Sequence, residues 1–326
     1  MPESQTSKWL IERGIGETRA ALIEDGAIVE ARIDLDGDIP AGRTVEARLQ
    51  SVGNNGRNAI AMLADGSEIL LPQRPAGVSE GATLHVIITR SHIPGPEPWK
   101  RPLGRAAADG ESEFGGVSLG EPLPFPPAGR DELEAVGWSD LLDEARTGTS
   151  QFAGGELRLF ANPAMTLIDV DGNLPPAELM KLGAAAAGAA IRRLNIGGSV
   201  GIDLPTVAGR ALRQKAAAAI DTALGELCFE RTAINGFGFV QVVLPRRNAS
   251  LLELAQDRAP FEARALLRRA AVSGSGPRRI VAHPAVIAVV ERSPPWLDAL
   301  ARQLGGAVTL RSDPSLAMSA GHVEPA

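Results

Sequence analysis

The chain has 326 residues but contains one cysteine, no tyrosine and an aromatic content of only 4%. A single cysteine excludes a disulfide within the chain and any cysteine pair that could bind zinc. No apolar run is long enough to cross a membrane, and residues 1–8 are polar, so we expect a cytoplasmic protein without a membrane partner. Cys228 lies in an apolar segment that we predict to be a strand, and we expect its thiol to be buried.

An excess of positive charge is also missing, because the formal net charge is −6. Proteins that bind nucleic acid are more often basic, since neutralising phosphates and releasing counterions favours binding. Positive charge is instead local, and it comes from Arg192, Arg193, Arg210, Arg213, Lys215, Arg246, Arg247, Arg268 and Arg269. Such residues also form ordinary solvated helix faces, and the sequence pattern leaves both interpretations open.

Two short apolar segments, 165–171 and 198–203, end in acidic residues. Runs of Val, Ile and Leu bounded by Gly and Pro predict buried strands, so Asp169, Asp171 and Asp203 are expected where a sheet meets solvent. Residues two apart point to the same face of a strand. If the two strands are neighbours, the three carboxylates converge, as in oxygen-rich sites for Mg²⁺ or Mn²⁺. An Asp after a strand is also a common turn or helix-cap residue, and that alternative stays open here.

Further elements are predicted around these two strands. The Ala-rich segment 177–194 and the segment 207–224 predict helices, and an acidic helix is expected over 132–146. Additional strands are expected over 227–233 and 237–244.

Five sequence blocks occur in order across this part of the chain. They are Gly-Gly-Glu-Leu-Arg-Leu-Phe (154–160), Ala-Met-Thr-Leu-Ile-Asp-Val-Asp (164–171), Gly-Gly-Ser-Val-Gly-Ile-Asp-Leu (197–204), Ile-Asn-Gly-Phe-Gly (234–238) and Arg-Arg-Asn-Ala-Ser-Leu (246–251). Together, and with helices between them, these blocks resemble the catalytic domain of the ribonuclease E/G family of bacterial endoribonucleases.

The resemblance implies an α+β / α/β fold with an RNase H-like and DNase I-like catalytic region, an inserted OB-type β-barrel and a small C-terminal α/β domain. The first expected units are the N-terminal strands of the RNase H-like part over 1–35 and the RNA-binding barrel over 40–93. A Pro/Gly-rich linker over 94–130, the DNase I-like domain over 131–270 and the C-terminal domain over 277–326 are expected to follow.

The strands within these units are also predicted. Alternating segments give the N-terminal strands 9–12, 18–23 and 28–33 and the barrel strands 44–52, 58–63, 68–71 and 83–90. At the C-terminus, strands over 279–291 and 307–311 are expected to flank a helix over 296–304.

The resemblance also implies a chemistry. Asp169 and Asp203 fall on the family's two metal-binding aspartates, with Mg²⁺ as the expected cofactor, Mn²⁺ as an alternative and no zinc. The metal would activate a water that attacks the phosphodiester of single-stranded RNA, leaving a 5′-phosphate and a 3′-hydroxyl. Asp171 is a third catalytic candidate. The candidate RNA-binding residues are Asn235, Arg246, Arg247, Arg213 and Lys215.

Several positions depart from the family pattern. Asp171 replaces an Asn, and Gly236 replaces an Arg expected near the scissile phosphate, a loss that commonly costs ~10² or more in rate. No Phe, Trp or Tyr lies between Trp9 and Trp99, so the barrel lacks the aromatics on which bases stack. The segment 94–130 has no Arg-Thr sensor for a 5′-monophosphate, and 270–277 has no Cys-Pro-x-Cys zinc link, which leaves a zinc-free homodimer through the C-terminal domain open.

Three hypotheses follow. The first is a short E/G-type endoribonuclease that needs Asp169 and Asp203. The second is a non-catalytic relative that binds RNA, a ribonuclease or a degradosome as a regulator, which Gly236 and the aromatic-free barrel favour. The third is a metal-dependent nuclease that acts on DNA or on a dedicated small RNA.

Overall fold

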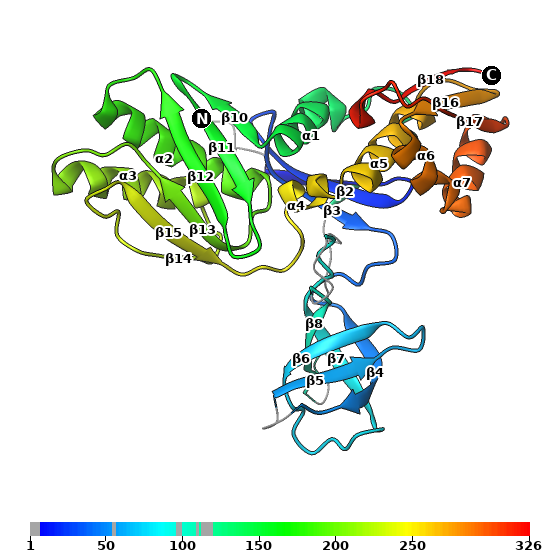
Figure 1. Cartoon of the computed structure of the whole chain (residues 1–326), viewed down its shortest axis with the longest axis horizontal. Coiled ribbons are helices and arrows are strands. Elements are labelled where there is room, and N and C mark those ends of the chain that lie inside the picture. Colours follow the sequence, from blue (N-terminus) through cyan, green and yellow to red (C-terminus); the bar gives the residue numbers. More distant parts are fainter. Residues whose placement is uncertain (1–6, 54–56, 96–99, 109–110, 112–119) are drawn as a thin grey trace, which may run out of the picture.

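The structure is a computed structural model that describes the chain except residues 1–6, 54–56, 96–99, 109–110 and 112–119. It contains an N-terminal sheet, a closed five-stranded barrel, a six-stranded sheet covered by helices, and a small C-terminal sheet with helices (Figure 1). The expected mixture of α and β structure with an inserted barrel is therefore confirmed at this level.

The N-terminal sheet is built from three antiparallel strands and one distant strand. They are β1 (Lys8–Arg13), β2 (Glu17–Glu24), β3 (Ala27–Leu35) and β9 (Glu121–Leu123), in the order β3-β2-β1-β9. The β2–β3 turn places Asp25 and Gly26 at positive φ, the conformation that tight hairpin turns require. Because β9 pairs with β1 in parallel, the chain leaves this sheet after β3 and returns to it after the barrel.

The barrel has its own aliphatic core and lies apart from the other sheets (Figure 1). Its strands are β4 (Thr44–Ser51), β5 (Arg57–Met62), β6 (Glu68–Gln73), β7 (Thr83–Arg90) and β8 (Leu103–Ala106), closed in the order β4-β5-β6-β8-β7. Strand β8 differs from the linker predicted over 94–130. It is short, and Gly104 fits because a Cβ there would collide with Val86.

The central sheet brings the two acidic strands together. Its strands are β10 (Thr149–Phe152), β11 (Gly155–Ala161), β12 (Thr166–Gly172), β13 (Gly198–Asp203), β14 (Glu230–Arg231) and β15 (Phe239–Leu244), in the order β10-β11-β12-β13-β15-β14. Helix α2 (Pro176–Arg193) joins the parallel strands β12 and β13. With α3 (Arg210–Leu224), it covers one face of the sheet (Figure 1). The two acidic strands are therefore neighbours, which is the condition that the convergence of their carboxylates required.

Three expectations in this region are wrong in whole or in part. The strand predicted over 227–233 is reduced to the two residues of β14, and Cys228 lies outside it with an exposed thiol. After α3 ends, Leu227 and Phe229 pack against the core, so the residue between them faces outward. The helix predicted over 132–146 is a short 3-10 turn, η2 (Glu134–Val136), followed by α1 (Trp138–Thr147).

The C-terminal unit, described here together with the two preceding helices α4 and α5, has more elements than predicted and differs in one of the predicted ones. Its elements are α4 (Leu251–Gln256), α5 (Arg258–Ala271), β16 (Arg278–Ala282), α6 (Pro284–Glu291), α7 (Pro294–Leu304), β17 (Val308–Ser312), η3 (Met318–Ala320) and β18 (His322–Pro325). The strand predicted over 279–291 is wrong in its second half, which is α6. A short apolar run does not distinguish strand from buried helix, and Pro284 here occupies the first turn, where proline fits a helix.

Buried ion pairs connect the N-terminal sheet to the rest of the molecule. The Arg19 guanidinium is almost fully buried and donates to Glu12 (2.7 Å) and to Asp131 (2.6 Å). Glu17 accepts from Arg264 (3.1 Å) and Arg268 (3.3 Å) of α5. Removing one partner of a buried pair is far more costly than removing an exposed one, so these pairs fix how the units meet. None of the described helices is long and apolar enough to cross a bilayer.

Candidate active site

Asp169 and Asp203 lie side by side at the ends of β12 and β13. They are Cα partners in the parallel register of these strands. Neighbouring strands lie about 4.8 Å apart and paired residues point to the same face, so the two carboxylates project together from the face that α2 and α3 leave uncovered. Two carboxylates that share a sheet edge are a suitable start for a divalent cation, which takes its remaining ligands from water.

Asp171 does not complete a three-carboxylate cage. In the part of the chain that the structure describes, no group of three or more His, Cys, Asp or Glu side chains is arranged to hold a metal ion. Asp171 follows Asp169 on the same face, opposite Glu156 of β11, and its Oδ2 lies 3.8 Å from Nη1 of Arg158. Asp169 and Asp203 are therefore the candidate metal ligands, and Asp171 adds a negative charge near them.

The acidic residues perturb one another. Partial burial raises the pKa of the Asp169 carboxyl above its ordinary value, and the charges of Asp171 and Asp203 raise it further, whereas Arg158 acts in the opposite direction. Like charges this close disfavour joint ionisation. A bound cation would offset the repulsion between the ionised carboxylates. A carboxyl whose pKa is perturbed at a sheet edge is also a candidate for a functional site.

Exposed apolar side chains surround the acidic pair. Phe160 is 52% exposed and pairs across the sheet with the exposed Leu167, and Phe237 is 81% exposed in the turn before β15. Because large aromatic side chains are usually buried, exposed ones beside a charged site suggest a contact surface. Sequence reasoning missed Arg158 and Phe160, although their alternation along β11 places them on the face that carries Asp169.

The turn before β15 is held against the end of β13. Asn235 Oδ1 accepts from the backbone N–H of Phe237 (2.9 Å) and of Phe239 (3.1 Å). Gly238 has φ 97°, and a Cβ there would collide with the carbonyl of Leu204, directly after Asp203. Asn235, a predicted RNA-binding residue, is thus placed near Asp203 and shapes the turn that presents Phe237.

Gly236 occupies the exposed part of this turn. A Cβ built on it meets no other atom within 4 Å. The position lacks the arginine of the family motif, yet the backbone leaves open space for a long side chain next to the acidic edge.

The other predicted RNA-binding residues lie in two places. Arg213 and Lys215 are on α3, and Arg213 Nη1 donates to the carbonyl of Val207 (3.2 Å), in the segment that follows Asp203. Arg246 and Arg247 follow β15 at the other end of the sheet, where Gly198 pairs with Leu244. Five strand residues, roughly 17 Å, separate that pair from Asp203. The structure therefore does not bring Arg246 or Arg247 to the aspartates.

A scan of the chain against protein-family models found no match, and a search of the curated proteins found none either. The resemblance to the ribonuclease E/G family therefore rests on the five sequence blocks and on how their residues are placed.

Proposed function

We propose that this protein is a divalent-metal-dependent endoribonuclease that cleaves single-stranded RNA at the acidic edge of the central sheet. The observation that carries the proposal is the register of β12 and β13, which pairs Asp169 with Asp203. The finer assignment of RNase H-like, DNase I-like and OB-type parts belongs to the same proposal and rests on the family resemblance.

The residues present fit a hard divalent cation. Asp169 and Asp203 would hold Mg²⁺ or Mn²⁺ through carboxylate oxygens, and the bound ion would lower the pKa of a water and offset charge on the phosphate. Arg158 lies across from Asp169 on β11 and supplies a guanidinium that can pair with a phosphate of the RNA. Phe237 and Phe160 offer faces on which unpaired bases can stack, which favours single strands over duplexes.

The test is cleavage of a fluorescent single-stranded RNA by purified protein in Mg²⁺, Mn²⁺ or EDTA. We expect Asp169→Asn and Asp203→Asn to lower the rate by ~10² or more, because each removes a metal ligand. Asp298→Asn is the matched control, since Asp298 is an exposed aspartate on α7. Cleavage that persists in EDTA or in both active-site variants would rule out this mechanism.

A second candidate is a non-catalytic relative that binds RNA or a ribonuclease partner. It is favoured by the open Gly236 position and by the absence of a three-carboxylate group among the described residues. RNA binding or copurification with a larger nuclease, without cleavage above the Asp169→Asn background, would support it. A DNA substrate in the same assay distinguishes a deoxyribonuclease from both.

A further inference from the structure

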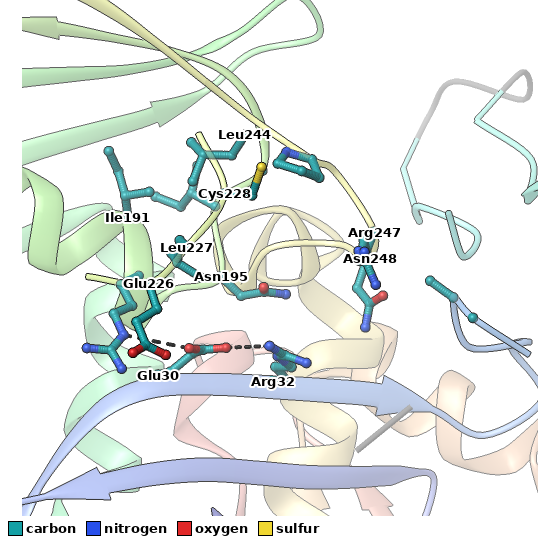
Figure 2. A pocket seen from close by; sticks show the side chains of 16 residues that line it. Glu30, Arg32, Ile191, Asn195, Glu226, Leu227, Cys228, Leu244, Arg247 and Asn248 are labelled. Atoms are coloured by element: carbon teal, nitrogen blue, oxygen red, sulfur yellow. Dashed lines mark hydrogen bonds and ion pairs between the residues drawn. The ribbon is translucent and has the colours of Figure 1, made fainter. Parts of the chain in front are cut away.

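We propose that the molecule has a second ligand site, at the opposite end of β13 from the aspartates, that binds one nucleotide through its phosphate and its base. The site is a cavity of about 350 Å³ between β3 and the end of the central sheet (Figure 2). This volume lies at the lower end of the range for small-molecule pockets. The proposal does not depend on RNA cleavage.

The cavity is assembled from four segments that are far apart in sequence. They are β3 with the loop after it, the last turn of α2 with residues 195–197, residues 226–228, and residues 244–248 after β15. Because its walls come from elements that are fixed by the shared core, the cavity is part of the folded framework.

The charged residues that line the cavity are three arginines and two glutamates, Glu30 and Glu226, and the buried carboxylate of Glu30 holds two of the arginines. Only 8% of the Glu30 side chain is exposed, and it pairs with Arg32 and with Arg192, whose Nε lies 3.7 Å from Glu30 Oε2. The Arg32 guanidinium also stacks over the ring of Trp9, 4.9 Å from its centroid, while 36% of the Arg32 side chain stays exposed at the cavity wall. A guanidinium that is fixed in this way and partly exposed can pair with an anion.

Arg247 adds a second cationic group on the same side. Its backbone carbonyl accepts from Ser91 N–H (2.8 Å), which fixes the chain there, while its exposed guanidinium has no ion-pair partner in the part of the chain that the structure covers. Figure 2 shows Arg32, Arg247 and Asn248 on one side of the cavity. Arginine pairs well with the planar geometry of phosphate and carboxylate oxygens.

The opposite wall is apolar, and it favours a ligand that carries a flat apolar ring in addition to an anionic group. Ile191, Leu227 and Leu244 lie across the cavity from Arg32 and Arg247 (Figure 2). A flat heterocycle can pack on such a wall, whereas an inorganic anion gains nothing from it. A ligand with a phosphate at one end and a base at the other uses both sides.

Two amides line the cavity, Asn195 between its charged and apolar sides and Asn248 beside Arg247 (Figure 2), and both can form hydrogen bonds with the edge of a base. Asn195, at φ 53°, donates through Nδ2 to the carbonyl of Ala249 (3.5 Å), and Asn248 donates through Nδ2 to Asp34 (3.2 Å). Both amide oxygens are without a hydrogen-bond donor among the described residues. They can therefore accept from an exocyclic amino group.

Cys228 provides a direct reporter of occupancy, because it is the only cysteine of the chain and its exposed thiol lines the cavity. The experiment follows the rate of maleimide labelling of Cys228 in EDTA, with AMP, UMP, adenosine, inorganic phosphate or a short RNA oligonucleotide. At ten times its Kd, a bound nucleotide should slow labelling about tenfold by mass action. Adenosine and phosphate alone should protect much less.

Two variants make the test specific. Arg247→Gln removes the exposed guanidinium, and Asn195→Asp places a negative charge in the cavity while tolerating the left-handed backbone. Both should lose the protection by nucleotide, whereas Arg292→Gln on the distant C-terminal unit should keep it. Protection by the mononucleotides identifies a free nucleotide as the ligand, and protection by the oligonucleotide alone identifies a nucleotide within RNA.

Three outcomes would overturn the proposal. They are labelling unaffected by any nucleotide or oligonucleotide, equal protection in Arg247→Gln, and protection by phosphate alone equal to that by AMP. Because labelling reports binding and not cleavage, these outcomes are distinct from a failure of the proposed nuclease activity.

Discussion

The two ends of strand β13 differ in the sign and in the compensation of their charge. At one end Asp203 lies beside Asp169, and no basic residue pairs with either carboxylate closely enough to prevent the rise in the pKa of Asp169. At the other end the cavity is lined by three arginines and two glutamates, and the buried Glu30 holds Arg32 and Arg192. The first end has unbalanced negative charge and is suited to a cation, whereas the second presents donors and is suited to an anion.

This difference shows that the two ends of one short strand can be suited to ligands of opposite charge. Its two ends are about 17 Å apart, so neither end neutralises the other through solvent at physiological salt. Each end acquires its character from the strands and loops packed beside it. The predictions below test each end in turn, from the largest expected effect to the smallest.

The largest effect should come from Gly236→Arg at the acidic end. The turn has space for the side chain, and under the proposed mechanism the arginine would place a guanidinium near the phosphate of an RNA bound at Asp169 and Asp203. We expect the rate of RNA cleavage to rise by up to ~10², measured in the fluorescent assay. Gly236→Gln fills the same space without charge, so an equal rise in that variant would show that charge is not the cause.

At the cavity end, Glu30→Gln should destabilise the fold. It leaves Arg32 and Arg192 without their shared carboxylate, and because both arginines are partly exposed we expect a loss of roughly 2 to 3 kcal/mol in the free energy of unfolding. Urea unfolding measures the change. Glu46→Gln, at an exposed position of the barrel, should leave the free energy of unfolding unchanged. Comparable losses of stability in the two variants would show that Glu30 contributes no more than an exposed glutamate.

Phe237→Ala should weaken RNA binding without changing stability. Phe237 is 81% exposed beside the acidic edge, and loss of one stacking contact is worth about 1 to 3 kcal/mol, or roughly tenfold in affinity. Fluorescence anisotropy with single-stranded RNA in EDTA reports the change. Val272→Ala removes an exposed apolar side chain at the end of α5 and should bind as the unmodified protein does. Unchanged affinity in Phe237→Ala would contradict a stacking role.

The smallest effect should be the pH dependence of Asp171→Asn. The variant removes a charge that raises the pKa of Asp169, so that pKa should fall towards its ordinary value. A raised folded-state pKa favours the fold below the unfolded-state pKa, and this advantage is lost as pH rises through the folded-state value. Removing part of the shift should therefore stabilise the protein slightly near pH 7 and have no effect in acid.

Carboxyl chemical shifts of Asp169, followed by NMR over a pH series, check the direction. A pKa of Asp169 that is unchanged or higher in Asp171→Asn would show that the two carboxylates do not interact.

The acidic end could be predicted from sequence because its signal is local. Each of β12 and β13 is a short apolar run that ends in an aspartate. That the two strands are neighbours was a condition that rested on the family resemblance. The structure adds the register that pairs Asp169 with Asp203. It also shows that Asp171 is directed to Arg158 at 3.8 Å, which depends on the neighbouring strand β11 and could not be inferred from β12 alone.

The cavity end could not be predicted, because its walls come from four separate segments. Cys228 shows the difficulty. Its apolar neighbourhood indicated a buried strand, yet the chain there has no regular secondary structure and only the neighbours Leu227 and Phe229 pack inward. Helix α6 was assigned to a strand for a similar reason, since a short run of Val, Ile and Ala carries no period that distinguishes the two.

The insertion of the barrel between β3 and β9 has a consequence for synthesis on the ribosome. Strand β1 emerges before the barrel, but its parallel partner β9 follows only after the whole barrel has been translated. Until then β1 has an open edge, which is a site for unwanted pairing. The barrel has a separate core and can fold meanwhile, so we expect the inserted unit to mature before the sheet that contains it is complete.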